Sequence, residues 1–330
     1  MSPESQQDFA LAFLSILFEG APFILLGTLI SGFLDVYLPS SVMERLLPKR
    51  RSLAIATAGL MGILFPVCEC AVVPVIRRLV KKGLPVSCGI TYMLAAPIVN
   101  PITALSTWKA FQGQGPAMMT CSRLLLGFLI AVGVGLVVAK LPLSAVLRQK
   151  LIDSLKEAEK PADRPLAECV HTHTTACESQ HAKSCDHAAN NDDRLVSAMR
   201  SAQKDFVDVG IYFAIGVSIT ALFNTGIAPG AEWLDSLAEN QVAAPAALMA
   251  LAFILSLCST SDAFIAANLD KFSWGAKLAF LCFGPMMDVK LLFLYQSIMR
   301  KRFIIILGIA LFLSIGCISW LIRNWLPLST

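Results

Sequence analysis

The feature that most constrains the fold is a long uncharged stretch near the end of the chain. Residues 303–322, FIIILGIALFLSIGCISWLI, contain no charged side chain, and about 20 apolar residues are enough for a helix to cross a bilayer. Charged residues make up only 15% of the chain, whereas about a quarter of a soluble domain is charged. Similar runs occur at 9–34, 53–76, 84–107, 124–139, 206–229, 242–269 and 278–297. We therefore expect an all-α, polytopic membrane protein with about eight membrane helical segments.

The chain also resembles itself. FEGAPFILLGTLISGFL at 18–34 matches FVDVGIYFAIGVSITAL at 206–222, with glycines and hydroxyl residues in corresponding places. Further matches keep an offset between 188 and 190 residues: Glu19 with Asp208, Cys68 with Cys258, and Asn100 with Asp288. This pattern predicts a first membrane repeat at 1–140, a polar linker loop at 141–204 and a second membrane repeat at 205–330.

Basic residues favour the cytoplasmic side of a membrane and so predict the topology. The segments 44–51 and 77–82 are both strongly basic, and a full crossing at 53–76 would place them on opposite sides. A re-entrant hairpin that turns at PVCEC places both inside. Each repeat then has three crossings and one hairpin, so the second repeat is inverted. The N-terminus is expected outside the inner (plasma) membrane and the 141–204 loop in the cytoplasm. Arg123 and Lys140, which flank the run at 124–139, are expected to snorkel.

The stretch FPVCECAVVP, residues 65–74, predicts a broken helix. Pro66 and Pro74 each remove a backbone donor and clash with the preceding turn. Irregular backbone is tolerated at membrane depth only where it is buried in protein or lines a cavity, and inverted repeats place substrate sites at such breaks. The second repeat has its counterpart at 256–262, SLCSTSD.

The residues at these breaks have the chemistry of a soft-ion pathway. Thiolates such as those of Cys68 and Cys70 select copper(I), zinc and trivalent arsenic, and a carboxylate such as Glu69 at membrane depth is a candidate functional group. The alternative is that the thiols only pack and that the carboxylate reaches the interface. The further predicted pathway residues are Asn100, Cys258, Ser259, Ser261, Asp262 and Asp288, with Met286 and Met287 as optional thioether ligands.

Three other charged residues lie in the membrane segments, and each has more than one candidate role. Glu19 and Asp208 occupy matching places in the two repeats, and we consider them proton-coupling candidates or, alternatively, satisfied polar groups at a helix junction. Lys290 is expected to pair with Asp288 or with Asp262. The four cysteines outside the breaks and the loop are expected to pack as small apolar groups: Cys88, Cys121, Cys282 and Cys317.

A second cluster lies in the linker, in ECVHTHTTACESQHAKSCDH at 168–187. It contains all four histidines of the protein and three of its ten cysteines. Tracts rich in Cys and His bind metal through thiolate and imidazole, although these spacings do not match a folded zinc finger. We interpret the tract as a flexible metal-capturing segment, the alternative being an accidental composition of the linker. Its candidate ligands are Cys169, His171, His173, Cys177, His181, Cys185 and His187.

The segment FPVCECAVVPVIRRLVKKGLP, followed by AAPIVNP, resembles the predicted permease family that includes the trivalent organoarsenical efflux permeases. The Cys/His-rich central loop is similar to that of its subgroup of copper/zinc efflux transporters. The resemblance implies an inner-membrane efflux permease rather than an enzyme. It also implies that the pathway is lined by Cys68, Cys70, Pro97, Asn100 and Pro101.

Four functions remain open from the sequence. The first is an exporter of zinc or copper(I), which needs no fixed cofactor and is coupled to protons or to a partner because the chain contains no P-loop motif. The second is an exporter of arsenite or methylarsenite through Cys68, Cys70 and Cys258. The third is a membrane thiol oxidoreductase, although redox pairs are usually C-x-x-C. The fourth is a non-transporting metal sensor. The expected partners are the cargo, the lipid bilayer, and either a second copy of the chain or a cytoplasmic metal carrier. The net charge of +4 gives no sign of nucleic-acid binding.

Overall fold

The computed structural model describes residues 3–37, 48, 50–65, 67–149, 151–153, 191–227, 243–269 and 271–325, and this part of the chain is almost entirely helical. The first half contains α1 (Pro3–Tyr37), α3 (Arg51–Leu64), α4 (Glu69–Lys81), α5 (Val86–Ala95), α6 (Pro101–Ala110) and α7 (Pro116–Val138), followed by the single turn α8 (Leu143–Val146). The second half contains α10 (Asn191–Ile227), α12 (Ala243–Leu255), α13 (Ser261–Ala267), α14 (Trp274–Met286), α15 (Val289–Tyr295) and α16 (Lys301–Trp325).

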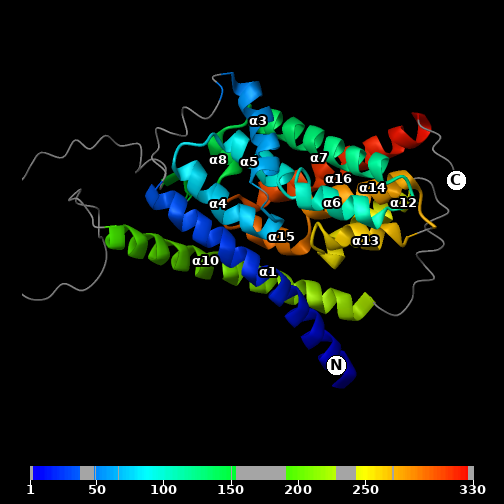
Figure 1. The fold of residues 1–330 in the computed structure, drawn as a ribbon, viewed down its shortest axis with the longest axis horizontal. Helices are drawn as coiled ribbons and strands as arrows, with labels where there is room; N and C mark the ends of the chain where they lie inside the picture. Colours follow the sequence, from blue (N-terminus) through cyan, green and yellow to red (C-terminus); the bar gives the residue numbers. More distant parts are fainter. Residues whose placement is uncertain are drawn as a thin grey trace, which may run out of the picture.

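The described helices of the two halves follow the same order. Each half begins and ends with a long helix, α1 and α7 or α10 and α16 (Figure 1). Between them lie two pairs of short helices, α3–α4 and α5–α6 in the first half and α12–α13 and α14–α15 in the second. The breaks within the pairs fall at 65–68 and 96–100, and at 256–260 and 287–288. The internal match in the sequence therefore corresponds to a repeated helical unit.

The pair α3–α4 folds back as a hairpin whose open end lies beside the C-terminus of α7. Ile55, near the start of α3, packs at Gly135 of α7. Arg78, near the end of α4, pairs with Asp205 in the N-terminal part of α10 at 2.7 Å. Arg148, which follows α8, bonds to Tyr212 of α10 at 3.0 Å, so these ends share one side of the molecule.

The hairpin α12–α13 opens toward the other side. Gln114, in the turn between α6 and α7, donates a hydrogen bond to the carbonyl of Ala267 at the end of α13, at 3.3 Å. This turn precedes α7, whereas the first hairpin opens beside the end of α7. The two hairpins therefore enter from opposite sides, α8 and α13 lie toward opposite ends of the molecule (Figure 1), and the second half is inverted relative to the first.

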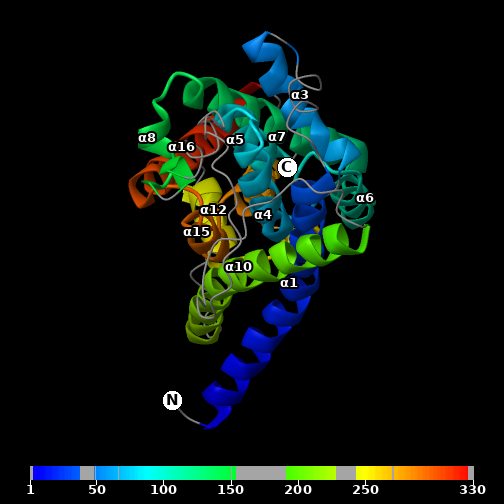
Figure 2. The ribbon, with the colours of Figure 1, turned by 90° about the vertical axis from the view of Figure 1, so that its left-hand side faces the viewer.

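The long helices enclose the broken ones. Figures 1 and 2 both show α1 and α10 packed along each other on one flank, with α7 and α16 on the opposite flank. Small residues allow the close contact between α1 and α10, since a Cβ at Gly32 would lie 2.9 Å from the Cβ of Ala202. The segment Trp274–Tyr295, which comprises α14 and α15, forms the centre, since 83% of the residues in its apolar 18-residue window are buried.

The surface and lengths of the helices fit a bilayer. Five described segments are long and apolar enough to cross a membrane, and three shorter apolar helices accompany them: Phe9–Phe33, Pro116–Val138, Leu195–Leu222, Trp274–Tyr295 and Lys301–Leu321, with Arg51–Leu64, Val86–Ala95 and Ala243–Leu255. Large side chains such as Leu313 and Ile306 are 64% exposed, as expected where lipid replaces water. The prediction of a polytopic all-α membrane protein is confirmed.

Several predicted boundaries require correction. Pro74 lies inside α4, so the first described break is short and ends at Cys68, while Pro66 lies outside the described residues. The predicted linker includes 191–204, but these residues begin α10 because Ala198 and Ala202 pack against α1. Arg123 does not snorkel: it is 1% exposed, within α7. The limits of the predicted domains otherwise stay a prediction.

Candidate functional site

The breaks of the two hairpins meet in the protein interior. Cys68 is the N-cap residue of α4, and Glu69 and Cys70 form the first turn of that helix. The carboxylate of Glu69 is 2% exposed and lies at the helix N-terminus, where the helix dipole favours a negative charge. Ser259, in the break of the other hairpin, donates a hydrogen bond from Oγ to Oε2 of Glu69 at 3.3 Å. Residues 190 positions apart in the sequence are thus brought into contact.

A narrow pocket lies at this junction. It is lined by Ile16, Glu19, Gly20 and Phe23 of α1, Phe213 of α10, Lys290 of α15, and by Cys68, Glu69, Cys70 and Cys258 from the two breaks. Pro74 has no N–H, so the carbonyl of Cys70 lacks its usual helical donor and remains an additional oxygen acceptor. Three thiols and two carboxylates from both halves therefore line one pocket.

Lys290 provides the positive charge at this site. Its Nζ lies 3.3 Å from Oε1 of Glu69 and 3.6 Å from Oδ2 of Asp288. It also donates hydrogen bonds to the carbonyls of Ser256 and Leu257, at 3.0 and 3.2 Å. The predicted pairing with Asp288 is confirmed, and the alternative pairing with Asp262 is wrong because Asp262 has another partner.

That partner is Arg123 of α7. Its Nη2 lies 2.9 Å from Oδ2 of Asp262, and the two side chains are 1% and 5% exposed. Arg123 also donates hydrogen bonds to Oγ1 of Thr107 and to the carbonyl of Ser259. Asp262 therefore belongs to a buried ion pair behind the second break rather than to the lining of the pocket. The sequence signal for this pair is an arginine beside an apolar membrane run, which is a functional candidate by default.

Asn100 and Asp288, which were predicted to line the cavity, act as caps of the short helices. Oδ1 of Asn100 accepts the N–H of Ile102 at 2.9 Å, and Pro101 occupies the first turn of α6, as is common at helix starts. Oδ1 of Asp288 accepts the N–H of Leu291 at 2.6 Å. Neither residue is among those that line the narrow pocket, although Asp288 reaches it through Lys290.

The two proton-coupling candidates have different surroundings. Glu19 lines the pocket, and its Oε1 accepts a hydrogen bond from Ser261 at 3.4 Å. Asp208 lies instead beside Arg77, 3.4 Å from its Nη1, at the open end of the first hairpin. The matching positions in the repeat are therefore not matched in environment, and only Glu19 lies at the site.

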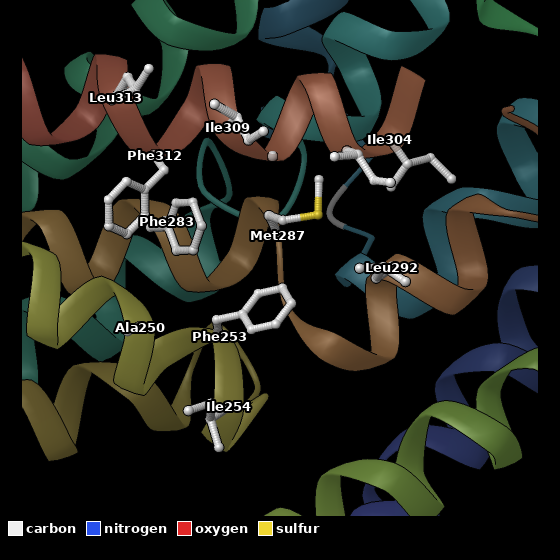
Figure 3. A pocket seen from close by; sticks show the side chains of 12 residues that line it. Ala250, Phe253, Ile254, Phe283, Met287, Leu292, Ile304, Ile309, Phe312 and Leu313 are labelled. Carbon is white, nitrogen blue, oxygen red and sulfur yellow. The ribbon is translucent and has the colours of Figure 1, made fainter. Parts of the chain in front are cut away.

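A second, larger pocket is apolar. Figure 3 shows Phe253, Phe283, Met287 and Phe312 pointing into it from α12, the α14–α15 segment and α16. The predicted thioether ligands are not at the thiol site, because Met287 faces this groove and Met286 is fully buried. Apart from the thioether of Met287, the side chains that line the groove are hydrocarbon, and this lining suits the acyl chains of a membrane.

The predicted loop ligands between Cys169 and His187 lie outside the described residues. Within the described part of the chain, no three side chains of His, Cys, Asp or Glu converge closely enough to hold a metal ion. At the pocket, the atom that lies among the acidic oxygens is the ammonium nitrogen of Lys290.

Comparison with known proteins agrees with this architecture. A family model described as a predicted permease matches residues 6–323. The chain belongs to this predicted permease family. Protein YcgR of Bacillus subtilis (strain 168), designated UPF0718, is 34% identical over 296 residues, which cover 89% of this chain and 90% of the relative.

A relative from Streptococcus mutans serotype c (strain ATCC 700610 / UA159) is 32% identical over 304 residues, covering 92% of this chain and 91% of that protein. Its name describes it, provisionally, as a two-component membrane permease complex subunit. No solved structure gives a significant match. The family and the membrane topology together identify a multi-pass membrane permease.

Proposed function

We propose that this permease exports soft or borderline heavy-metal ions, zinc(II) or copper(I), from the cytoplasm across the inner membrane. The observation that supports this proposal is that Cys68, Cys70, Cys258 and Glu69 line one pocket between the two halves. These side chains must move closer together to bind an ion, because no three of them are close enough in the described structure. Thiolates with a carboxylate suit these ions. Inverted repeats that rock about a shared site can expose it to each side in turn.

The Cys/His tract at 168–187 supplies the second part of the proposal. With the N-terminus outside, the tract faces the cytoplasm, where thiols stay reduced, and there it captures the ion and delivers it to the pocket. Coupling is to protons, with Glu19 as the candidate carboxylate at the site, or to a second protein. The name of the Streptococcus mutans relative, a subunit of a two-component permease complex, supports a partner chain.

Arsenite or a trivalent organoarsenical is the second candidate cargo. Trivalent arsenic binds three thiolates, and the pocket contains three thiols with contributions from both hairpins. In that function the loop histidines are dispensable.

The test is the metal content of cells that lack their own exporters, measured by mass spectrometry after loading with zinc, copper, arsenite or methylarsenite. We expect the intact protein to lower zinc or copper, the Cys68→Ser/Cys70→Ser and Cys258→Ser variants to abolish the effect, and deletion of 168–187 to weaken it. Cys121→Ser is the matched control because Cys121 is exposed on α7, away from the pocket. A decrease confined to the arsenicals would favour the second candidate, and no decrease for any cargo would contradict both.

A further inference from the structure

The ammonium group of Lys290 is held as a cation is held in an oxygen cage. Its Nζ contacts a carboxylate oxygen of Glu69 and one of Asp288, and the carbonyl oxygens of Ser256 and Leu257, at distances from 3.0 to 3.6 Å. The two carbonyls belong to the break after α12, where no helix uses them. Carboxylates and backbone carbonyls at breaks are also the groups that bind cations in other membrane transporters with inverted repeats.

Asp288 offers Lys290 a second, unused acceptor. Oδ1 of Asp288 caps α15, but Oδ2 is buried and accepts no hydrogen bond within the described residues. A buried carboxylate oxygen without a donor is rare and calls for an explanation. Oδ2 lies 3.6 Å from Nζ of Lys290, so a small movement of the lysine would satisfy it.

The backbone of Lys290 is fixed while its side chain has this choice. A Cβ at Gly216 of α10 would lie 2.8 Å from Cα of Lys290, so the two helices are in direct backbone contact there. Nζ can therefore change its partner only through rotation of the lysine side chain. The two carboxylates within its reach are that of Glu69, in the first half, and that of Asp288, at the start of its own helix.

We propose that Lys290 competes with a cationic cargo for Glu69, and that binding of the cargo displaces Nζ from Glu69 onto Oδ2 of Asp288. This inference rests on the proposed function, since it requires an ion that binds at Glu69 and the thiols. Two cations cannot share one buried carboxylate without repulsion. A neutral cargo, such as undissociated arsenite, binds the thiols without displacing the lysine.

Displacement also breaks the link that Glu69 and Lys290 form between the two halves. The link joins α4 of the first half to α15 of the second, and separating the partners of a buried ion pair leaves each charge buried without its partner. A cationic cargo therefore releases one of the contacts that hold the halves together, whereas an unoccupied site keeps it closed.

The experiment measures cargo binding at the pocket itself and uses the purified full-length protein. Alkylation of Cys258 by N-ethylmaleimide, read by peptide mass spectrometry, is titrated with zinc or with arsenite, so that binding by the loop does not interfere. We expect Lys290→Met to lower the zinc concentration for half-protection about tenfold. We expect Asp288→Asn, which keeps the cap oxygen, to raise it. Neither variant should change half-protection by arsenite.

A general loss of stability cannot lower the zinc concentration for half-protection in one variant and raise it in the other. Lys277→Met removes another buried lysine of the second half, one that lies in α14 outside the pocket, and should leave both titrations unchanged. Two results would overturn this inference and leave the proposed function standing. One is an equal change of the half-protection concentration for zinc and for arsenite. The other is an unchanged half-protection concentration in Lys290→Met when zinc protects the wild type. If wild type is protected by neither ion, the proposed function and this inference fall together.

Discussion

At the scale of single residues, two buried ion pairs at the breaks each join the two halves. Glu69 of the first break pairs with Lys290 of the second half, and Asp262 of the second break pairs with Arg123 of the first half. Such pairs contribute little net stability, but breaking one leaves an isolated buried charge. We therefore regard these pairs as fixing how the halves fit together rather than as a source of stability.

Replacement of Arg123 tests this view. Arg123→Leu leaves Asp262 buried without its partner, and we expect a loss of about 3–5 kcal/mol, measured as a lower midpoint of thermal unfolding in detergent. Arg123→Leu/Asp262→Asn removes both charges and should recover part of the loss. The exposed Arg148, which bonds to Tyr212, serves as control, since loss of an exposed polar contact costs about 0–1 kcal/mol. A double variant no more stable than the single one would contradict the argument.

At the scale of helices, matching glycines set how closely the long helices approach the broken ones. A Cβ at Gly27 of α1 would lie 2.7 Å from the carbonyl oxygen of Ala71, in the first turn of α4. Gly216 of α10 takes the same role against Lys290 of α15. Each long helix therefore rests directly on the backbone of a helix that begins at the site, and side chains cannot be inserted there without moving it.

Gly216→Ala should therefore be harmful, although alanine is the better helix former. The added methyl would push α10 away from Lys290, and overpacking of this kind costs about 1–3 kcal/mol. Gly210→Ala on the same helix is the control: no atom lies within 4 Å of its added Cβ, and about 1 kcal/mol of helix stability should be gained. Thermal unfolding gives the sign for each variant, and equal behaviour of the two would refute the close-contact explanation.

At the scale of the whole molecule, the inverted arrangement makes a prediction about topology. The start of α3 and the start of α5 lie at the open end of the first hairpin, and the turn before α7 lies on the other side. In intact cells, an impermeant maleimide should label Gln112→Cys but label Arg51→Cys and Pro85→Cys only after permeabilisation. The prediction rests on the basic residues beside the first hairpin, which favour the cytoplasmic side.

The unmodified protein gives the background from its native thiols. Labelling of Arg51→Cys and Pro85→Cys from opposite sides would show that the segment between them crosses the membrane, and the inverted repeat would be refuted. Labelling of both from outside would leave the fold intact and reverse its orientation.

The sequence by itself determined the class of fold, and it pointed to the repeat and to the residues of the first break as candidates for the site. Runs such as 303–322 must be helices because a bilayer offers no partner for an open backbone. The two prolines and the balance of basic residues predicted a break at 65–74, and the structure places a shorter break that ends at Cys68, with Pro74 inside α4. The match of Cys68 with Cys258 corresponds in the structure to two breaks that line one pocket.

Only the tertiary structure decided the pairing of charges and the fate of the matched residues. Glu19 and Asp208 match in sequence, yet only Glu19 lies at the pocket, because side-chain surroundings depend on which helix packs alongside. The sequence offered Asp288 or Asp262 as partners of Lys290, and its contact with Glu69, 221 positions away, emerged only in the structure. Contacts of that range depend on how the two halves pack, and hydrophobic periodicity along one helix carries no information about them.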